Sequence, residues 1–315
     1  MAGIDSRVNL LICTNGPYLQ HAAVCLRSLL ENNADLFFNI VLVGQSGERL
    51  DGEKLIASLG RRDRYSLSIK SFKPPQECVL PLNPFALYTL DIWTRLWISD
   101  FFGPEVKRAL YLDGDIVVVG SIAQLWNADL GGAMLGAVDI PGSLRGVTDL
   151  GMRPEDGYFN SGVLLFDLEQ WRRDHALEEL LSYVSRNLER LRDPDQDALN
   201  ACFSNRRQRL DYKWNLIRPF YRHPPALALS GSILDEALAD ERIIHFNGRL
   251  KPWSYFSDHP RTSEYWKYLQ MTAWRDFVPV DKTPINMVRK RVSKIVPMGV
   301  KTRMRTLFSP LFSHK

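Results

Sequence analysis

Apolar residues occur along this chain in short runs that alternate with segments of helical spacing. Strand-like runs are expected at 7–14, 39–44, 66–72, 109–112, 116–119, 134–138, 162–166 and 242–244, and helices at 21–30, 53–59 and 168–186. Strands that alternate with helices predict an α/β fold, in which a parallel sheet is covered on both faces. Such a sheet binds its ligands at the carboxyl ends of its strands.

The segment 141–156 contains two prolines and three glycines without a clear period, and we expect a loop there. The chain shows no internal repeat, and no linker rich in Pro, Gly or Ser divides it before about residue 279. We therefore expect one domain at 1–278 and a separate tail at 279–315.

The composition, 45% hydrophobic and 24% charged residues, is that of an ordinary globular protein and excludes general disorder. The apolar runs are far shorter than the ~18 residues of a spanning helix, and residues 1–7 do not resemble a secretory signal. The four cysteines are scattered, so the sequence indicates neither a zinc site nor a disulfide framework. These features predict a cytoplasmic protein that does not cross a membrane.

The formal net charge of +4 is distributed unevenly. Residues 280–315 carry nine Lys and Arg against one acid, Asp281, so the rest of the chain is slightly acidic. Apolar residues lie between the basic ones, a pattern typical of a segment that binds an anionic membrane surface. A solvated or disordered end is the alternative, and we expect no nucleic acid partner because the rest of the chain has no comparable basic stripe.

Asp113 and Asp115 directly follow the strand-like run 109–112. Carboxylates two positions apart project to the same side of an extended chain, and paired oxygen ligands favour magnesium or manganese. The spacing alone is weak evidence because the sequence contains three Asp-x-Asp pairs, and surface acids in a turn are the alternative. The position at the end of an apolar strand favours a ligand site.

His245, Gly248 and Lys251 lie within seven positions of one another, after the strand-like run 242–244. A divalent cation held by carboxylates and an imidazole, beside a lysine, is suited to neutralise a departing diphosphate. Taken alone, a single histidine is more often a core or surface residue.

Two further segments, 157–162 (GYFNSG) and 195–200 (DQDALN), are rich in hydrogen-bonding groups. The first lies at the start of an apolar strand and the second is expected just before a helix. Both suit the hydroxyl groups of a sugar. Helix capping would explain Asp195 and Asp197 equally well.

In their order and approximate spacing, 13–18, 111–118 (YLDGDIVV), 158–168 (YFNSGVLLFDL), 195–200 and 245–253 (HFNGRLKPW) resemble the motifs of family 8 of the retaining glycosyltransferases. The similarity is closest to bacterial galactosyl- and glucosyltransferases that build lipopolysaccharide or lipooligosaccharide cores. It covers residues 7 to about 275, and the basic tail resembles the membrane-attaching end of those enzymes.

The resemblance implies one Rossmann-like nucleotide-sugar-binding domain of the GT-A type, with a mostly parallel central sheet and a basic C-terminal tail. It also implies a UDP-hexose donor, a saccharide or glycolipid acceptor and manganese as cofactor, with magnesium as the alternative. The expected location is peripheral, on the cytoplasmic face of the membrane.

The resemblance also assigns roles to residues. The metal ligands would be Asp113, Asp115 and His245. The residues around UDP would be Cys13, Thr14, Asn15, Tyr18, Gly114, Gly248 and Lys251. The residues around the donor hexose would be Arg95, Asp139, Asn160, Ser161, Asp195 and Gln196.

Two positions depart from the family pattern. Asn15 stands where an Asp often pairs with uracil, although an amide carbonyl still accepts the uracil N–H. Trp93 stands where a Tyr is usual; it retains stacking and loses the hydroxyl. We therefore retain uridine as the expected base.

The resemblance makes Asp195 and Gln196 the candidate catalytic residues and implies that Gln196 lies below the sugar. An amide oxygen is a poorer nucleophile than a carboxylate, so we favour same-face substitution, in which a diphosphate oxygen assists deprotonation of the acceptor. We expect 141–156 and 210–225 to shape the acceptor pocket.

Two other functions were weighed. A phosphatase is disfavoured because its Asp-x-Asp-Gly motif has glycine after the second acid, whereas Gly114 lies between the two. A catalytically inactive sugar- or lipid-binding protein of the same fold is the alternative that remains.

Overall fold

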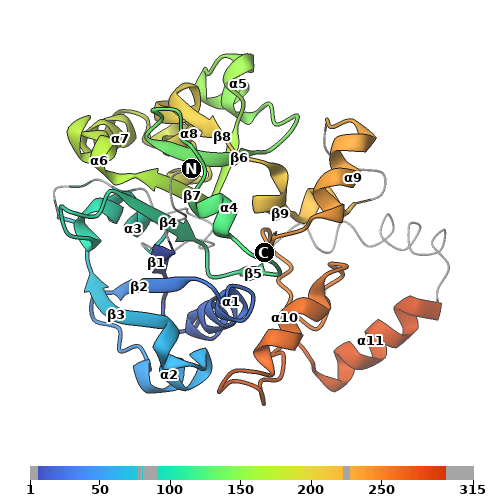
Figure 1. Ribbon diagram of the computed structural model, residues 1–315. Coiled ribbons are helices and arrows are strands. Elements are labelled where there is room, and N and C mark those ends of the chain that lie inside the picture. The colour runs from blue at the N-terminus through green and yellow to red at the C-terminus, as the bar shows by residue number, and fades with distance from the viewer. Residues whose placement is uncertain (1–5, 77, 79, 81–90, 223–227, 296–315) are drawn as a thin grey trace.

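The computed structural model describes residues 6–76, 78, 80, 91–222 and 228–295 (Figure 1). The strands are β1 (Arg7–Cys13), β2 (Phe37–Gln45), β3 (Tyr65–Phe72), β4 (Arg108–Leu112), β5 (Ile116–Val118), β6 (Leu135–Asp139), β7 (Phe159–Asp167), β8 (Arg207–Arg209), β9 (Leu216–Ile217) and β10 (Ile243–His245). The helices are α1 (Leu19–Glu31), α2 (Gly52–Leu59), α3 (Asp91–Thr94), α4 (Ala123–Trp126), α5 (Arg145–Leu150), α6 (Leu168–Arg173), α7 (Ala176–Arg186), α8 (Pro194–Phe203), α9 (Gly231–Ala239), α10 (Thr262–Leu269) and α11 (Pro284–Ile295).

Within these residues, seven strands form the central sheet in the order β3-β2-β1-β4-β7-β6-β8. Strands β3, β2, β1 and β4 are parallel, as are β6 and β8, whereas β7 runs antiparallel to both its neighbours. The predicted mostly parallel sheet is confirmed. Because β2 and β3 lie on one side of β1 and β4 lies on the other, the strand order switches between β1 and β4, where a parallel sheet opens a crevice for ligands.

Helices cover both faces of the sheet, as the continuous apolar strands predicted. Leu10 of β1 packs in one core with residues of α1 and α2, while its neighbour Leu11 packs in a second core with residues of α6, α7 and α8. Successive side chains of a strand point to opposite faces, so a strand between two helical layers must be apolar at both positions.

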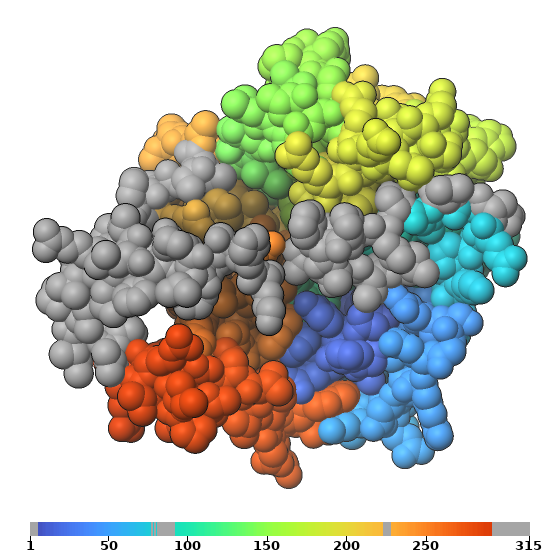
Figure 2. All heavy atoms as spheres, turned by 180° about the vertical axis from the view of Figure 1, so that it is seen from behind, coloured from blue at the N-terminus to red at the C-terminus, as the bar shows by residue number. Residues whose placement is uncertain are grey.

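A smaller sheet, β5-β10-β9, joins the C-terminal part of the chain to the central domain. β10 is antiparallel to β5, with His245 opposite Ile116. Figure 1 shows α10 beside α1, and Val24 of α1 shares a core with Tyr265 and Leu269 of α10. From behind, Figure 2 shows orange and red residues of the C-terminal segment beside the blue N-terminal ones.

Three sequence predictions of local structure were wrong. The helix expected at 168–186 is divided into α6 and α7 at His175, whose φ of 52° lies in the left-handed region and ends the helical path. The loop expected at 141–156 contains α5, and its Arg145 pairs with Asp197 of α8. The acids expected before a helix lie inside α8, which begins at Pro194, a residue suited to the first helical turn.

The predicted tail begins with ordered structure, and residues 296–315 lie outside the described part. Asp281 accepts hydrogen bonds from Ser254 Oγ (2.6 Å) and Tyr255 N (2.8 Å). Lys290 of α11 lies over the Tyr255 ring, 4.3 Å from its centroid. The boundary between 278 and 279 stays a prediction.

Two features that the sequence does not predict are a membrane-spanning helix and a disulfide bond. None of the described helices is long and apolar enough to cross a membrane. All four cysteines are described, and none of them forms a disulfide bond.

Candidate active site

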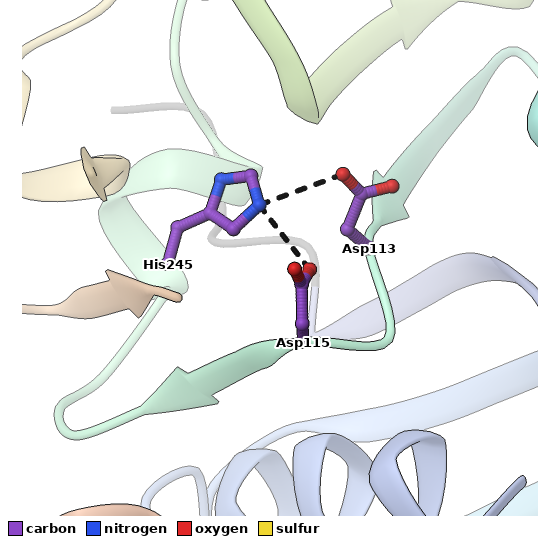
Figure 3. Close-up of side chains that lie close together, drawn as sticks. All are labelled: Asp113, Asp115 and His245. Atoms are coloured by element: carbon purple, nitrogen blue, oxygen red, sulfur yellow. Dashed lines mark ion pairs between the residues drawn. The ribbon is translucent and has the colours of Figure 1, made fainter. Parts of the chain in front are cut away.

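Two aspartates and one histidine, distant in sequence, converge beyond the carboxyl end of β4 (Figure 3). His245 Nε2 lies 3.2 Å from Asp115 Oδ1 and 3.6 Å from Asp113 Oδ2. One ligand atom from each residue lies within 4.8 Å of the others. Two carboxylates and an imidazole suit a divalent cation such as manganese or magnesium.

Backbone pairing explains why these residues meet. Phe246 N donates to Asp115 O (3.0 Å), which continues the β5-β10 ladder into the turn after β4. On the other side, Asp113 N donates to Gly162 O (2.9 Å), because antiparallel β7 begins where β4 ends. The site is therefore a product of both sheets.

Hydrogen bonds fix the His245 ring in a form suited to metal binding. Its Nδ1 lies 2.9 Å from Asn215 Oδ1, and Asn215 Nδ2 donates to Asn160 Oδ1 (2.9 Å). Because the Asn215 carbonyl accepts, Nδ1 carries a hydrogen, and Nε2, which faces the aspartates, is the nitrogen that could give its lone pair to a cation. This arrangement is a second observation that fits a cation among the three side chains.

Gly162 leaves the space in which the cluster fits. A Cβ at this position would overlap His245 Cε1 and lie 2.7 Å from Asp113 Oδ2. Any larger residue would therefore displace the histidine, the aspartate or both. Gly162 lies in the 157–162 segment, but the sequence of that segment does not indicate this contact.

Basic side chains balance the two aspartates. Lys251 Nζ lies 2.5 Å from Asp115 Oδ2, and Arg95 Nη2 lies 3.0 Å from Asp113 Oδ1. Burial opposes ionisation of Asp115, but Lys251 and His245 outweigh it and hold its pKa well below the ordinary value. Burial likewise opposes the Lys251 charge, and Asp115 reverses this and raises the lysine pKa. Both groups are therefore charged at neutral pH.

Tyr111 joins the charged cluster from β4. Its hydroxyl donates to Asp113 Oδ1 (2.7 Å), and the Arg95 guanidinium lies over its ring, 4.4 Å from the centroid. The sequence reasoning found Arg95 and missed Tyr111, although Tyr111 is the first letter of the YLDGD segment.

A neutral hydrogen-bond network surrounds Gln196. Its Oε1 accepts from Asn160 Nδ2 (2.9 Å) and from Ser161 N (3.1 Å). Its Nε2 donates to the Tyr158 hydroxyl (3.0 Å), which in turn donates to Asp197 Oδ1 (2.6 Å). Both lone pairs of the amide oxygen are thus engaged by the protein.

Asp195 connects this network to the charged cluster. Its Oδ2 lies 3.3 Å from Arg95 Nε and accepts from Ser161 Oγ (3.2 Å). Burial raises its pKa to about 6, although Arg95 opposes the shift. Asp197 lies in the 195–200 segment, which was expected either to suit sugar hydroxyls or to cap a helix, and it pairs with Arg145 and accepts from Tyr158.

The residues expected around UDP follow the carboxyl ends of β1, β4 and β10. Asn15 Oδ1 accepts from Tyr18 N (3.0 Å) at the start of α1, and Thr14 N donates to Val43 O (2.9 Å). Cys13 ends β1, and Gly114 lies against α1 at Ala22. Gly248 has a φ of 93°, a conformation that favours glycine, and leads into Lys251.

Asp139 lies opposite Phe159 in the β6-β7 ladder, next to Asn160, but its side chain has other partners than the remaining residues expected around the donor hexose. It pairs with Arg207 and Arg209 of β8, and not with the groups that hold Gln196. It also lines a cavity of about 550 Å³. The other residues lining this cavity are Arg209, Leu210, Asp211, Tyr212, Lys213, Ile233, Glu236, Ala237 and Asp240.

The sequence reasoning also missed Asn215, which has no motif around it. Its role depends on lying between His245 and Asn160, two residues far from it in sequence. Pairing of β9 with β10 brings it there. No local pattern could have indicated this contact.

Comparison with known proteins gives consistent results. The family model "Glycosyl transferase family 8" matches residues 9–257. General stress protein A of Bacillus subtilis (strain 168) is 25% identical over 275 residues, which cover 86% of this chain and 96% of that protein. Lipopolysaccharide 1,2-glucosyltransferase of Escherichia coli (strain K12) is 26% identical over 295 residues, covering 92% and 85% respectively.

A similar solved structure is that of galactosyltransferase LgtC in complex with donor and acceptor sugar analogues. It superposes with a TM-score of 0.73 at 21% identity and covers 87% of this chain and 98% of that one. The similarity confirms the predicted GT-A-type fold.

Proposed function

The chain belongs to glycosyl transferase family 8, and we propose that it transfers galactose or glucose from a UDP-sugar to a saccharide acceptor with retention of configuration. The convergence of Asp113, Asp115 and His245 beside Lys251 carries this proposal. Relatives named as lipopolysaccharide glucosyl- and galactosyltransferases support a lipopolysaccharide or lipooligosaccharide core as the acceptor.

We propose manganese as the cofactor, with magnesium as the alternative. Asp113, Asp115 and His245 would hold it, and when bound it would supply positive charge to the diphosphate. Lys251 stays protonated at neutral pH and would add a second positive charge for the leaving UDP. Arg95 holds Asp113 and Asp195 in place from the other side.

The contacts of Gln196 support same-face substitution. For its oxygen to attack the sugar, it would have to give up the bonds from Asn160 and Ser161 N. The Asp195 Oδ2 atom is similarly held by Arg95 and Ser161. We therefore assign Gln196 to support of the positively charged sugar, while a diphosphate oxygen assists loss of the acceptor proton. A sugar trapped covalently on Gln196 or Asp195 would contradict this mechanism.

We place the acceptor in the cavity beside Asp139. Its lining residues from 210 to 213 lie in the region 210–225, from which an acceptor pocket was expected, and its charged and hydroxyl groups suit a hydrophilic saccharide. Replacing Glu236, on the α9 side of the cavity, with alanine should raise the KM for the acceptor and leave UDP affinity unchanged. An unchanged acceptor KM would argue for a different pocket.

We also propose that 279–315 attaches the protein to the cytoplasmic face of a membrane. Val280, Ile285 and Val288 are exposed by 60% or more beside basic residues of α11, which supports this reading. Deleting 280–315 should reduce sedimentation with anionic vesicles and spare turnover on a soluble acceptor. Unchanged sedimentation would refute the role of the tail.

The central test measures UDP release from UDP-galactose and UDP-glucose with manganese, with and without a truncated core oligosaccharide. We expect release that depends on the acceptor and stops with EDTA. UDP-sugar binding without any release would favour the alternative, an inactive sugar-binding protein of the same fold.

A further inference from the structure

His21 lies beside the candidate site, although no motif drew attention to it. It is the third residue of α1, and only 6% of its surface is exposed. The next residue, Ala22, packs against Gly114 in the turn that carries the two aspartates. The imidazole is therefore held at the edge of the metal and diphosphate region.

Aromatic neighbours fix the ring. His21 stacks on Trp253, with ring centroids 3.4 Å apart and planes 10° apart. Trp253 follows Lys251 by two residues, so the stack ties α1 to the segment that supplies the lysine. The Tyr265 hydroxyl lies 2.7 Å from Nδ1 of His21.

These contacts determine which nitrogen carries the hydrogen. Gln20 Nε2 donates to the Tyr265 hydroxyl oxygen (3.3 Å), and among the described residues His21 Nδ1 is the one acceptor within reach of the hydroxyl hydrogen, so the hydroxyl donates to Nδ1. Burial, opposed by Asp115 and assisted by Lys251, lowers the pKa of His21 to about 3, so the ring is neutral at physiological pH. A neutral ring that accepts at Nδ1 carries its hydrogen on Nε2.

This Nε2–H group is available to a ligand. In the described part of the chain it has no hydrogen-bond acceptor, and it is not sealed from solvent. A donor in a largely buried ring gains most from an oxygen that arrives with charge. The nearby carboxylate of Asp115 is already engaged by Lys251 and His245.

We propose that His21 Nε2–H donates a hydrogen bond to a diphosphate oxygen of the sugar nucleotide. This inference rests on the proposed function, which brings a diphosphate to Lys251. A neutral imidazole supplies a directed hydrogen bond and adds no further positive charge. Because negative charge grows on the diphosphate as the sugar leaves, the bond strengthens along the reaction.

The test compares binding of UDP and uridine to the full-length protein with manganese, by calorimetry. His21→Phe keeps a ring on Trp253 and removes the donor, so we expect UDP affinity to fall about tenfold or more, while uridine affinity is unchanged. His21→Gln keeps an amide N–H and should recover part of the loss. His21→Met replaces the phenylalanine variant if that variant does not fold, as judged by circular dichroism.

Equal UDP affinity in wild type and His21→Phe would overturn the inference, and so would an equal loss for UDP and uridine. Failure of the proposed function looks different, because the wild-type protein would then bind no UDP at all. A kcat that falls while the donor KM rises, in a variant whose uridine affinity is normal, would support the hydrogen bond to the leaving group.

Discussion

The two ends of the candidate site shift the pKa of a carboxylate in opposite directions. At one end, Lys251 and His245 hold the pKa of Asp115 well below its ordinary value. At the other end, burial raises the pKa of Asp195 to about 6, next to a network of neutral groups around Gln196. The pKa of each carboxylate is therefore set by the charges and the burial around it.

This difference matches the two tasks of a sugar transfer from a nucleotide diphosphate. The charged end suits a leaving group that gains negative charge, whereas the neutral end offers hydrogen bonds to hydroxyls and no freely available nucleophile among the groups around Gln196. The proposed same-face mechanism needs this division. Four experiments test this division, and the expected change in activation, unfolding or binding free energy decreases from the first to the last.

Removing the charge of Asp115 should have the largest effect. Asp115→Asn deletes the partner of both Lys251 and His245, and we expect turnover with manganese to fall about a thousandfold while the fold is kept. The measurement is acceptor-dependent UDP release, with circular dichroism of the same sample.

Asp63→Asn is the matched control, because Asp63 is an exposed acid that pairs with Arg61 at the surface. It should leave turnover unchanged. Normal turnover in Asp115→Asn would remove the charged end from the mechanism.

The pH dependence of the free energy of unfolding should report the raised pKa of Asp195, at the end of the site around Gln196. The raised pKa means that folded Asp195 holds its proton more tightly than the unfolded chain does, so stability falls as pH rises from about 4 to about 6. The full contribution is on the order of 3 kcal/mol. Urea midpoints of the metal-free protein between pH 4 and 7 would measure it.

Asp195→Asn is the reference for this measurement, because it cannot ionise. The difference in stability between wild type and variant should change across the window and be constant above it. Parallel curves would show that the Asp195 pKa is not raised.

Truncating Gln196 should separate chemistry from nucleotide binding. Gln196→Ala removes contacts to Asn160 and Tyr158, and we expect kcat to fall roughly 10- to 100-fold while UDP affinity stays within about twofold. Gln270→Ala, at an exposed position, is the control. A large loss of UDP affinity would mean that the two ends do not act separately.

A single methyl group at Gly162 should disturb the charged end more mildly. Gly162→Ala presses on His245 and Asp113, so manganese affinity should fall about tenfold. Gly231→Ala, where a Cβ meets nothing within 4 Å, should leave manganese affinity unchanged. If both variants bind manganese like the wild type, the cluster does not depend on the close approach of β7.

Local patterns predicted much of the fold. The apolar runs at 7–14 and 39–44 became β1 and β2 because strands buried on both faces need apolar residues at every position. Sequence patterns did not predict structure that depends on contacts between residues distant in sequence. The short helix α5 rests on the Arg145 to Asp197 pair, which no window of sequence contains.

The sequence by itself determined the residue types of the site, their place at strand ends and the family resemblance. The tertiary structure decided which of them meet: His245 with Asp115 through β5 and β10, Asn215 with His245, and Gly162 with His245 and Asp113. It also decided that the Gln196 oxygen is engaged and that His21 stacks on Trp253. The reason is that periodicity follows from the geometry of one strand or helix, whereas contacts, burial and pKa values depend on groups brought together from distant parts of the chain.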